Sequence, residues 1–370
     1  MKQLSTRQGC VMLFIVTCAM KLLALPSLLI KTSGNAAWLA VIMMFLIDGS
    51  LLLIVFGLMK SFPNLSFKQF LKQCLGSVVT KIILFILGLL FALKVAMLAR
   101  ECYEFFTETA YVDFSWLVYL VPLGMVLGYL STKEIRALAR GGEIFLYFIV
   151  FAISVSFLFS IASFDAFSVL PFLPKGFSPV TTSLLDYCFW FGDFLIVFFY
   201  MGDVKYEKNS FKKMFVAYAS AMAVVLGLTL IHYSLFGSVS INYKTSIVDV
   251  TEYIPRITAP GRFTWVIIFL WPIALLFSMV VYQNLSVKCF QDCFNIEKKD
   301  KKYISYCAVA LSLSFLIITA FSQNIFIQII TSYVKYAVFV IQVILPLFLP
   351  VLMLINFKRE NVSHEKSLEK

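Results

Sequence analysis

The stretch from Gly9 to Ile30, GCVMLFIVTCAMKLLALPSLLI, is long and apolar enough to cross a membrane, but Lys21 and Pro26 interrupt it. A proline inside a helix removes a backbone donor and clashes with the preceding turn. A second apolar stretch, Thr182–Met201, holds Trp-Phe-Gly-Asp-Phe at residues 190–194, with a glycine and a carboxylate near its middle. Both stretches therefore predict membrane helices that are broken close to the bilayer midplane.

The rest of the chain has the same apolar character. Hydrophobic residues make up 61% of the 370 residues and charged residues 14%, whereas soluble domains have roughly half and a quarter. A helix needs about 20 apolar residues to cross a bilayer, and its backbone must satisfy its own hydrogen bonds there. The sequence predicts an all-α polytopic membrane protein with about ten such helices: Gly9–Ile30, Ala37–Met59, Val78–Ala99, Phe114–Leu130, Glu143–Phe164, Thr182–Met201, Met214–Leu235, Phe263–Val287, Tyr303–Ser322 and Ile329–Phe357.

The distribution of positive charge predicts the orientation of these helices. Lysine and arginine number 31, against 20 acidic residues. If the N-terminus lies in the cytoplasm, most of these cations fall in cytoplasmic segments, and few fall in the loops on the other side. This asymmetry is typical of the positive-inside rule. We expect both termini in the cytoplasm, and we attribute the positive charge to membrane topology rather than to nucleic-acid binding.

Ten helices divide into two sets of five, each of which opens with an interrupted helix. Broken helices at corresponding positions are typical of inverted-repeat, LeuT-like transporters, which bind substrates and ions at the midplane beside the breaks. We therefore expect a 5+5 inverted repeat with helices 1 and 6 broken. Its parts are a first five-helix repeat at residues 1–165, a second at 166–358 and a polar cytoplasmic tail at 359–370. The alternative for either break alone is a kink without a ligand.

Four ionisable residues fall deep within the predicted spans. They are Lys21 in the first, Asp48 in the second, Lys94 in the third and Asp193 in the sixth. A charge in the middle of a membrane costs several kcal/mol, so such residues face a partner or a cavity. Two cations and two anions balance, and we expect one buried cluster in which Lys21 pairs with Asp193. This pair either only orients the two helices or changes protonation with ligand occupancy.

Several ionisable residues are expected nearer the membrane surfaces. His232 and Lys335 are predicted to extend to the outer interface. The glutamates that end the third span are predicted to form a wetted helix face. Asp186 either lines an access path or sits at a solvated helix end. Residues 65–74 are predicted to form an amphipathic helix along the cytoplasmic interface. The glutamates are Glu101, Glu104 and Glu108.

The sequence lacks the short motifs of several enzyme classes. It has no phosphate-binding Gly-x-x-x-x-Gly-Lys-Ser/Thr loop, no His-Glu-x-x-His zinc motif and no Gly-x-Ser-x-Gly nucleophile motif. Only two histidines are present. We expect the protein not to be an enzyme, and we predict no catalytic residue, no metal and no cofactor.

Short motifs along nearly the whole chain carry a family resemblance. They include Leu25-Pro26, the run Gly-Asn-Ala-Ala-Trp-Leu at 34–39, Phe191-Gly192-Asp193, and Gly261-Arg262-Phe263 with the later Trp271. Their order and spacing resemble the B-subunit family of spore germinant receptors, also called spore germination permeases. That family is a branch of the amino acid–polyamine–organocation transporter superfamily. The chain departs from the family pattern at the first break, where Lys21 stands about where members often have glycine. Asp193 and Thr264 each replace a glutamate.

This resemblance implies a membrane subunit that senses an amino acid or a similar small nutrient in a transporter-like midplane pocket. It implies the spore inner membrane or the cell plasma membrane as the location. The partners implied are membrane lipid, a larger A-subunit and a lipoprotein C-subunit, with no nucleic acid. A proton-coupled amino-acid permease and a membrane scaffold with a degenerate pocket remain alternatives. The expected ligand-binding residues are Lys21, Ala24, Leu25, Pro26, Phe191, Gly192 and Asp193, beside the buried charges Asp48 and Lys94.

Overall fold

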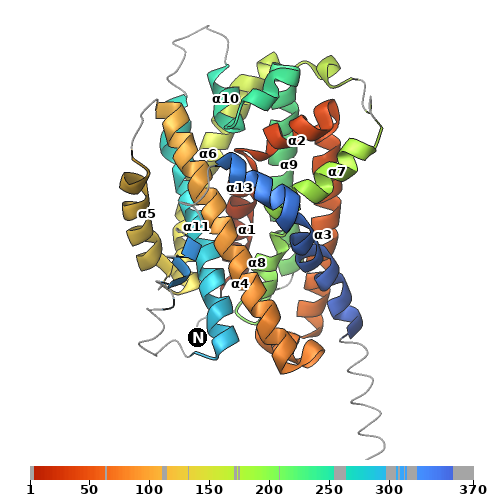
Figure 1. The fold of residues 1–370 in the computed structure, drawn as a ribbon, viewed down its shortest axis with the longest axis vertical. Coiled ribbons are helices and arrows are strands. Elements are labelled where there is room, and N and C mark those ends of the chain that lie inside the picture. The colour runs from red at the N-terminus through yellow and green to blue at the C-terminus, as the bar shows by residue number, and fades with distance from the viewer. Residues whose placement is uncertain are drawn as a thin grey trace, which may run out of the picture.

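The computed structural model shows a bundle of helices (Figure 1). It describes residues 4–62, 65–110, 115–131, 133–170, 173, 176–207, 209–253, 264–296, 306, 309–311, 313–314 and 323–352. Within these residues every regular element is a helix, and the only strand-like pairing is an isolated parallel bridge between Leu4 and Val204. The predicted all-α class is confirmed for this part of the chain.

The longer elements alternate with short helical pieces. The first group is α1 (Thr6–Lys21), α2 (Leu25–Ser33), α3 (Ala37–Ser61), α4 (Phe67–Ala110), α5 (Trp116–Ser131) and α6 (Ile135–Ser160). The second is α7 (Ser178–Asp186), the 3-10 turn η4 (Cys188–Trp190), α8 (Phe194–Phe199), α9 (Ser210–Phe236), the 3-10 segment η5 (Gly237–Asn242), α10 (Ser246–Glu252) and α11 (Thr264–Phe294). A last helix comprises α13 (Gln323–Ile329), the π-helical turn η6 (Ile330–Val334), α14 (Lys335–Phe339) and the π-helical turn η7 (Val340–Ile344).

Six helical stretches are long and apolar enough to cross a membrane: Leu25–Ser61, Phe67–Thr109, Ile135–Leu158, Ser210–Asn242, Trp265–Phe294 and Asn324–Leu352. They correspond to the predicted second, third, fifth, seventh, eighth and tenth spans. The fourth is represented by a shorter apolar helix, Val118–Ser131. The first and sixth are each divided into two short helices. Most of the ninth span lies outside the described residues, as do the tail at 359–370 and Gly261–Phe263.

The outer surface of the bundle is apolar along α5 and α6. Val118 and Met125 on α5 and Ile144, Tyr147 and Leu158 on α6 are each more than 60% exposed. An apolar face of this extent on a soluble protein would be a site of association, and in lipid it is the favourable state. The helices and their exposed apolar faces together indicate a multi-pass membrane protein.

A kink divides α4 into a short piece and a long one. Gly76 has φ 78° and ψ 174°, which no helix contains and which glycine adopts most easily. The short piece before it buries Phe67, Phe70 and Leu71 against the bundle, while Lys72 is exposed. This is the amphipathic helix predicted at residues 65–74. The long piece packs along α11 and carries Lys94 into the centre of the bundle.

Candidate functional site

The first interruption lies between α1 and α2. Helix α1 ends at Lys21, residues 22–24 are not helical, and α2 begins at Leu25. Pro26 stands in the first turn of α2, where its missing N–H would have no intrahelical partner. The proline therefore starts the second half of the broken helix rather than bending a continuous one. The carbonyl oxygen of Leu23 accepts a hydrogen bond of 3.1 Å from the backbone N–H of Ser246, at the start of α10.

The second interruption lies between α7 and α8. After the 3-10 turn η4, Phe191 is extended, with φ −105° and ψ −167°, and Gly192 has φ 84°. A positive φ of this size strains any residue with a Cβ, so glycine is required at position 192. Asp193 follows directly and precedes the first residue of α8. Both predicted interruptions are present, at the residues that the sequence indicates.

The two broken helices are tied together on either side of their breaks. Near the N-terminus, Leu4 exchanges two backbone hydrogen bonds of 2.8 Å with Asp203 and Lys205, which follow α8. At the far end of α2, the Ser33 hydroxyl lies 2.6 Å from the Ser183 hydroxyl of α7. Helix α1 thus pairs with α8, and α2 pairs with α7. The two pairs meet at the interruptions.

An ion pair joins the two interruptions. The Lys21 ammonium donates to Oδ2 of Asp193, and both side chains are fully buried. The Tyr282 hydroxyl of α11 donates to the other oxygen, Oδ1, over 3.1 Å. The Lys21 ammonium also lies 4.8 Å from the centroid of the Phe191 ring, within range of a cation–π attraction. The predicted pairing of Lys21 with Asp193 is confirmed.

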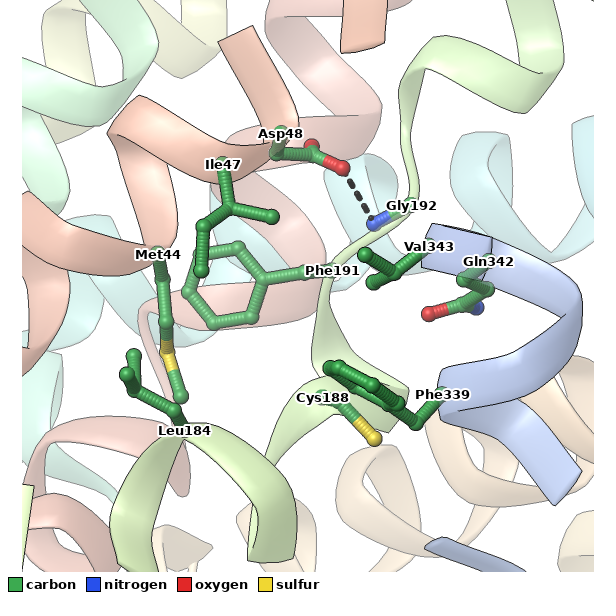
Figure 2. A pocket seen from close by; sticks show the side chains of 10 residues that line it. All are labelled: Met44, Ile47, Asp48, Leu184, Cys188, Phe191, Gly192, Phe339, Gln342 and Val343. Carbon is green, nitrogen blue, oxygen red and sulfur yellow. Dashed lines mark hydrogen bonds between the residues drawn. The ribbon is translucent and has the colours of Figure 1, made fainter. Parts of the chain in front are cut away.

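The remaining two buried charges bind the backbone of the second interruption. Lys94 on α4 donates to the Phe191 carbonyl oxygen over 2.6 Å. On α3, Oδ1 of Asp48 accepts the Gly192 N–H over 3.0 Å, as Figure 2 shows, and its Oδ2 accepts the Tyr218 hydroxyl over 2.8 Å. Two cations and two anions thus converge on residues 191–193, where the backbone has left the helix and needs other partners. The expected charge cluster is present.

A cavity lies on one side of the second interruption, between α3, α7, η4 and the last helix (Figure 2). It leaves about 30 Å³ for the centres of water molecules. Its lining consists of Met44, Ile47, Asp48, Leu184, Cys188, Phe191, Gly192, Phe339, Gln342 and Val343.

Only part of the predicted site borders this cavity. Of the nine residues predicted from the sequence, Phe191, Gly192 and Asp48 line it. The two buried lysines and Asp193 are hydrogen-bonded in the charge cluster beside it, and Ala24, Leu25 and Pro26 are buried at the first interruption without reaching it. Sequence reasoning missed Gln342. The signal was available, because Gln342 is the one amide within the apolar run from Ala337 to Ile355.

The family of the chain follows from comparison with known proteins. A family model described as "Spore germination protein" matches residues 3–325. The chain belongs to this spore germination protein family. Spore germination protein KB of Bacillus subtilis (strain 168) is 27% identical over 256 residues, which are 67% of this chain and 64% of that relative. The match thus spans less than two thirds of the relative's length.

Two expectations about the outer charges of this spore germination protein were wrong. His232 does not extend to an interface, because it is fully buried, with Nε2 3.8 Å from Oδ2 of Asp249. Glu101 does not lie on a wetted face, because it is 2% exposed and accepts the Trp190 indole N–H over 3.4 Å. Lys335 binds Asp186, with 2.6 Å between Nζ and Oδ1, and both side chains are partly exposed.

The outermost charges of the third span form ion pairs. Glu104 accepts from Arg100 in its own helix over 3.1 Å, and Lys244 lies 3.0 Å from Glu108 and 3.5 Å from Glu104. The two pairs made by Lys244 connect α4 to the segment before α10. No group of three His, Cys, Asp or Glu side chains suited to a metal ion occurs within the described ranges.

Proposed function

We propose that this spore germination protein is the nutrient-sensing membrane subunit of a germinant receptor. Its ligand is an amino acid or a similar small nutrient, bound at the midplane beside the broken helices. The observation that carries this proposal is the convergence of Lys21, Asp48, Lys94 and Asp193 on one interruption, deep in an apolar bundle. Such intramembrane charges mark ligand or ion sites by default, because each is costly to bury.

The proposed architecture is the ten-helix inverted repeat with helices 1 and 6 broken, and with both termini in the cytoplasm. Six long apolar helices, a shorter one and two broken helices support this arrangement. The Lys21 ammonium, beside the first break, would act as a tethered cation where transporters of this architecture often hold a metal ion.

The paired halves supply a physical route for a signal. Leu4 is bound to the segment after α8, and Ser33 is bound to Ser183. A ligand that binds one arrangement of the interruptions more tightly than another shifts the population toward it. Helices α2 and α7 would then move together relative to α1 and α8. A larger A-subunit and a lipoprotein C-subunit would receive this change.

The test is a thermal-shift screen of the purified full chain in detergent against amino acids, sugars and nucleosides. A ligand that binds only the folded state raises the melting temperature with its concentration. The double variant Lys21→Met with Asp193→Leu runs alongside, because it removes both charges together. We expect an amino acid to stabilise the parent chain and to have less effect on the double variant. If no compound raises the melting temperature of a well-folded parent chain, the sensing proposal is wrong and the scaffold alternative is favoured.

A proton-coupled permease would share this pocket, so uptake must be measured separately. Proteoliposomes with a pH gradient and a radiolabelled ligand from the screen give the distinction. We expect no accumulation above empty liposomes. Accumulation driven by the gradient would identify a permease instead.

A further inference from the structure

One buried polar side chain has no role in the charge cluster. Gln342 on η7 is 2% exposed, and its Nε2 has no hydrogen-bond partner among the described residues. A buried donor without a partner costs stability, so native proteins contain few of them. The side chain stands in a π-helical turn, Val340–Ile344. Such turns occur frequently at functional sites, because one extra residue re-aims the side chains around it.

Gln342 lies directly against the second interruption. A Cβ added to Gly192 would stand 2.7 Å from Cδ of Gln342 and 2.8 Å from its Nε2. Only a glycine at position 192 leaves room for the Gln342 carboxamide. Glycine at position 192 therefore permits both the positive φ of the backbone and the close approach of Gln342. Any movement of Gln342 changes the environment of the residue whose N–H is held by Asp48.

Three acceptor groups at the breaks already have partners. The Leu23 carbonyl accepts from Ser246, the Phe191 carbonyl accepts from Lys94, and the Asp193 carboxylate accepts from Lys21 and Tyr282. A ligand at those positions would have to displace the chain's own donors. A ligand beside Gln342 would instead supply a partner that the carboxamide lacks.

The cavity beside Gln342 has the lining that a small amphipathic molecule requires. Asp48 and Gln342 supply polar groups to its wall, and Met44, Leu184 and Phe339 are among its apolar residues (Figure 2). Pockets of this kind combine apolar walls with a few polar groups that fix orientation. The adjoining cluster has two lysines and two aspartates and is neutral, so a ligand without net charge leaves that balance intact.

We propose that this cavity is the nutrient site, that its ligand is an α-amino acid with an apolar side chain, and that Gln342 binds the ligand's carboxylate. The proposal rests on the sensing function proposed above and gives its site and ligand class. The ammonium lies toward Asp48, the carboxylate accepts from Nε2 of Gln342, and the side chain contacts Met44, Leu184 and Phe339. The Gln342 carboxamide packs closely against Gly192, and it moves away from Gly192 as the ligand enters.

The test compares ligand binding by three variants of the full chain, with alanine, valine and leucine as probes and glucose and inosine as other nutrient classes. Gln342→Leu removes the carboxamide and keeps a similar volume. Leu184→Trp fills the cavity from a partly exposed position. Gln283→Leu is the matched control, because Gln283 is also fully buried, has no amide partner within the described part of the chain and does not line the cavity.

We expect an apolar amino acid to bind the parent chain and the control with affinities within about twofold. Gln342→Leu should bind at least tenfold more weakly, a loss typical of removing one good polar contact. Its melting temperature without ligand should not fall, because an unpartnered buried amide has been removed. Leu184→Trp should also lose binding, and it tests the cavity independently if Gln342→Leu folds poorly.

The outcomes separate this inference from the function on which it rests. If none of the probes binds the parent chain, the sensing proposal fails with it. If an amino acid binds the parent chain, and Gln342→Leu and Leu184→Trp bind it equally well, the site lies elsewhere and only this inference is overturned. Preferential binding of glucose or inosine at the same residues would overturn the ligand class.

Discussion

Replacing Lys21 with methionine should destabilise the fold strongly. Among the described residues, the substitution leaves the fully buried Asp193 carboxylate with Tyr282 as its remaining side-chain donor. Breaking a buried ion pair from one side costs about 3–5 kcal/mol, because the partner charge stays buried and uncompensated. The double variant, Lys21→Met with Asp193→Leu, leaves no such charge. It loses the acceptor of the Tyr282 hydroxyl, which costs about 1–3 kcal/mol.

The double variant should therefore be more stable than the Lys21→Met variant, although it carries one more substitution. The free energy of unfolding of the four chains of this cycle is measured by reversible denaturation in mixed micelles. Lys244→Met is the control, because Lys244 is 49% exposed, and exposed ion pairs contribute about 0–1 kcal/mol. A cost below about 1 kcal/mol for Lys21→Met, or a double variant whose cost equals the sum of the singles, would refute the reasoning.

Three other substitutions test separate parts of the structure. Gly192→Ala should destabilise the fold by about 1–3 kcal/mol, because φ is 84° at this position and the added Cβ would stand 2.7 Å from Gln342. Adding Gln342→Ala should recover only the part of this cost that comes from the clash with Gln342, and unfolding in micelles measures both. Tyr218→Phe should cost about 1–3 kcal/mol, because Asp48 loses a buried donor at 2.8 Å; no loss in melting temperature would mean that Asp48 has another donor. Burial lowers the pKa of Lys244, but its bonds to Glu108 and Glu104 raise it more, so the pKa lies above its ordinary value of 10.5. Its stabilisation should be fully present below pH 10.5 and lost as the pH rises through that higher pKa, so the cost of Lys244→Met, under about 1 kcal/mol, should vanish in alkaline denaturation curves.

Depth in the membrane made the charge cluster predictable from the sequence. A lipid-buried charge has few low-energy arrangements, and a cation opposite an anion is the simplest of them. Counting residues from the ends of the apolar stretches places Lys21 and Asp193 at the same depth, and the structure pairs them. The same argument predicted that Asp48 and Lys94 join them, but not that both would bind backbone groups of residues 191–192.

The sequence pattern could not predict contacts between segments that are distant along the chain. The sequence around Leu23 does not indicate that the Ser246 N–H donates to the Leu23 carbonyl oxygen. Only the packing of α10 over the break brings the two residues together. Glu101 follows Lys94 by seven residues, which places both on one helix face, yet a polar run at a helix end indicates water as readily as burial. Gln342 was the hardest to place, because a π-helical turn shifts the register of its helix against its neighbours.

The proposed ligand contacts determine how far the nutrient can shift the protein between two states. Moving an equilibrium from 1:99 to 99:1 requires about 5.5 kcal/mol of differential binding. A single hydrogen bond to a neutral group contributes about 0.5–1.5 kcal/mol, and one to a charged group about 1.5–3 kcal/mol. Gln342 alone therefore cannot drive such a change. A ligand that also draws Asp48 away from the Gly192 N–H acts on two of the groups that hold the interruption, while its side chain buries apolar surface against Met44 and Leu184. A full response thus requires the ammonium, the carboxylate and the apolar side chain in one molecule, and analogues that lack any one of the three should bind without producing it.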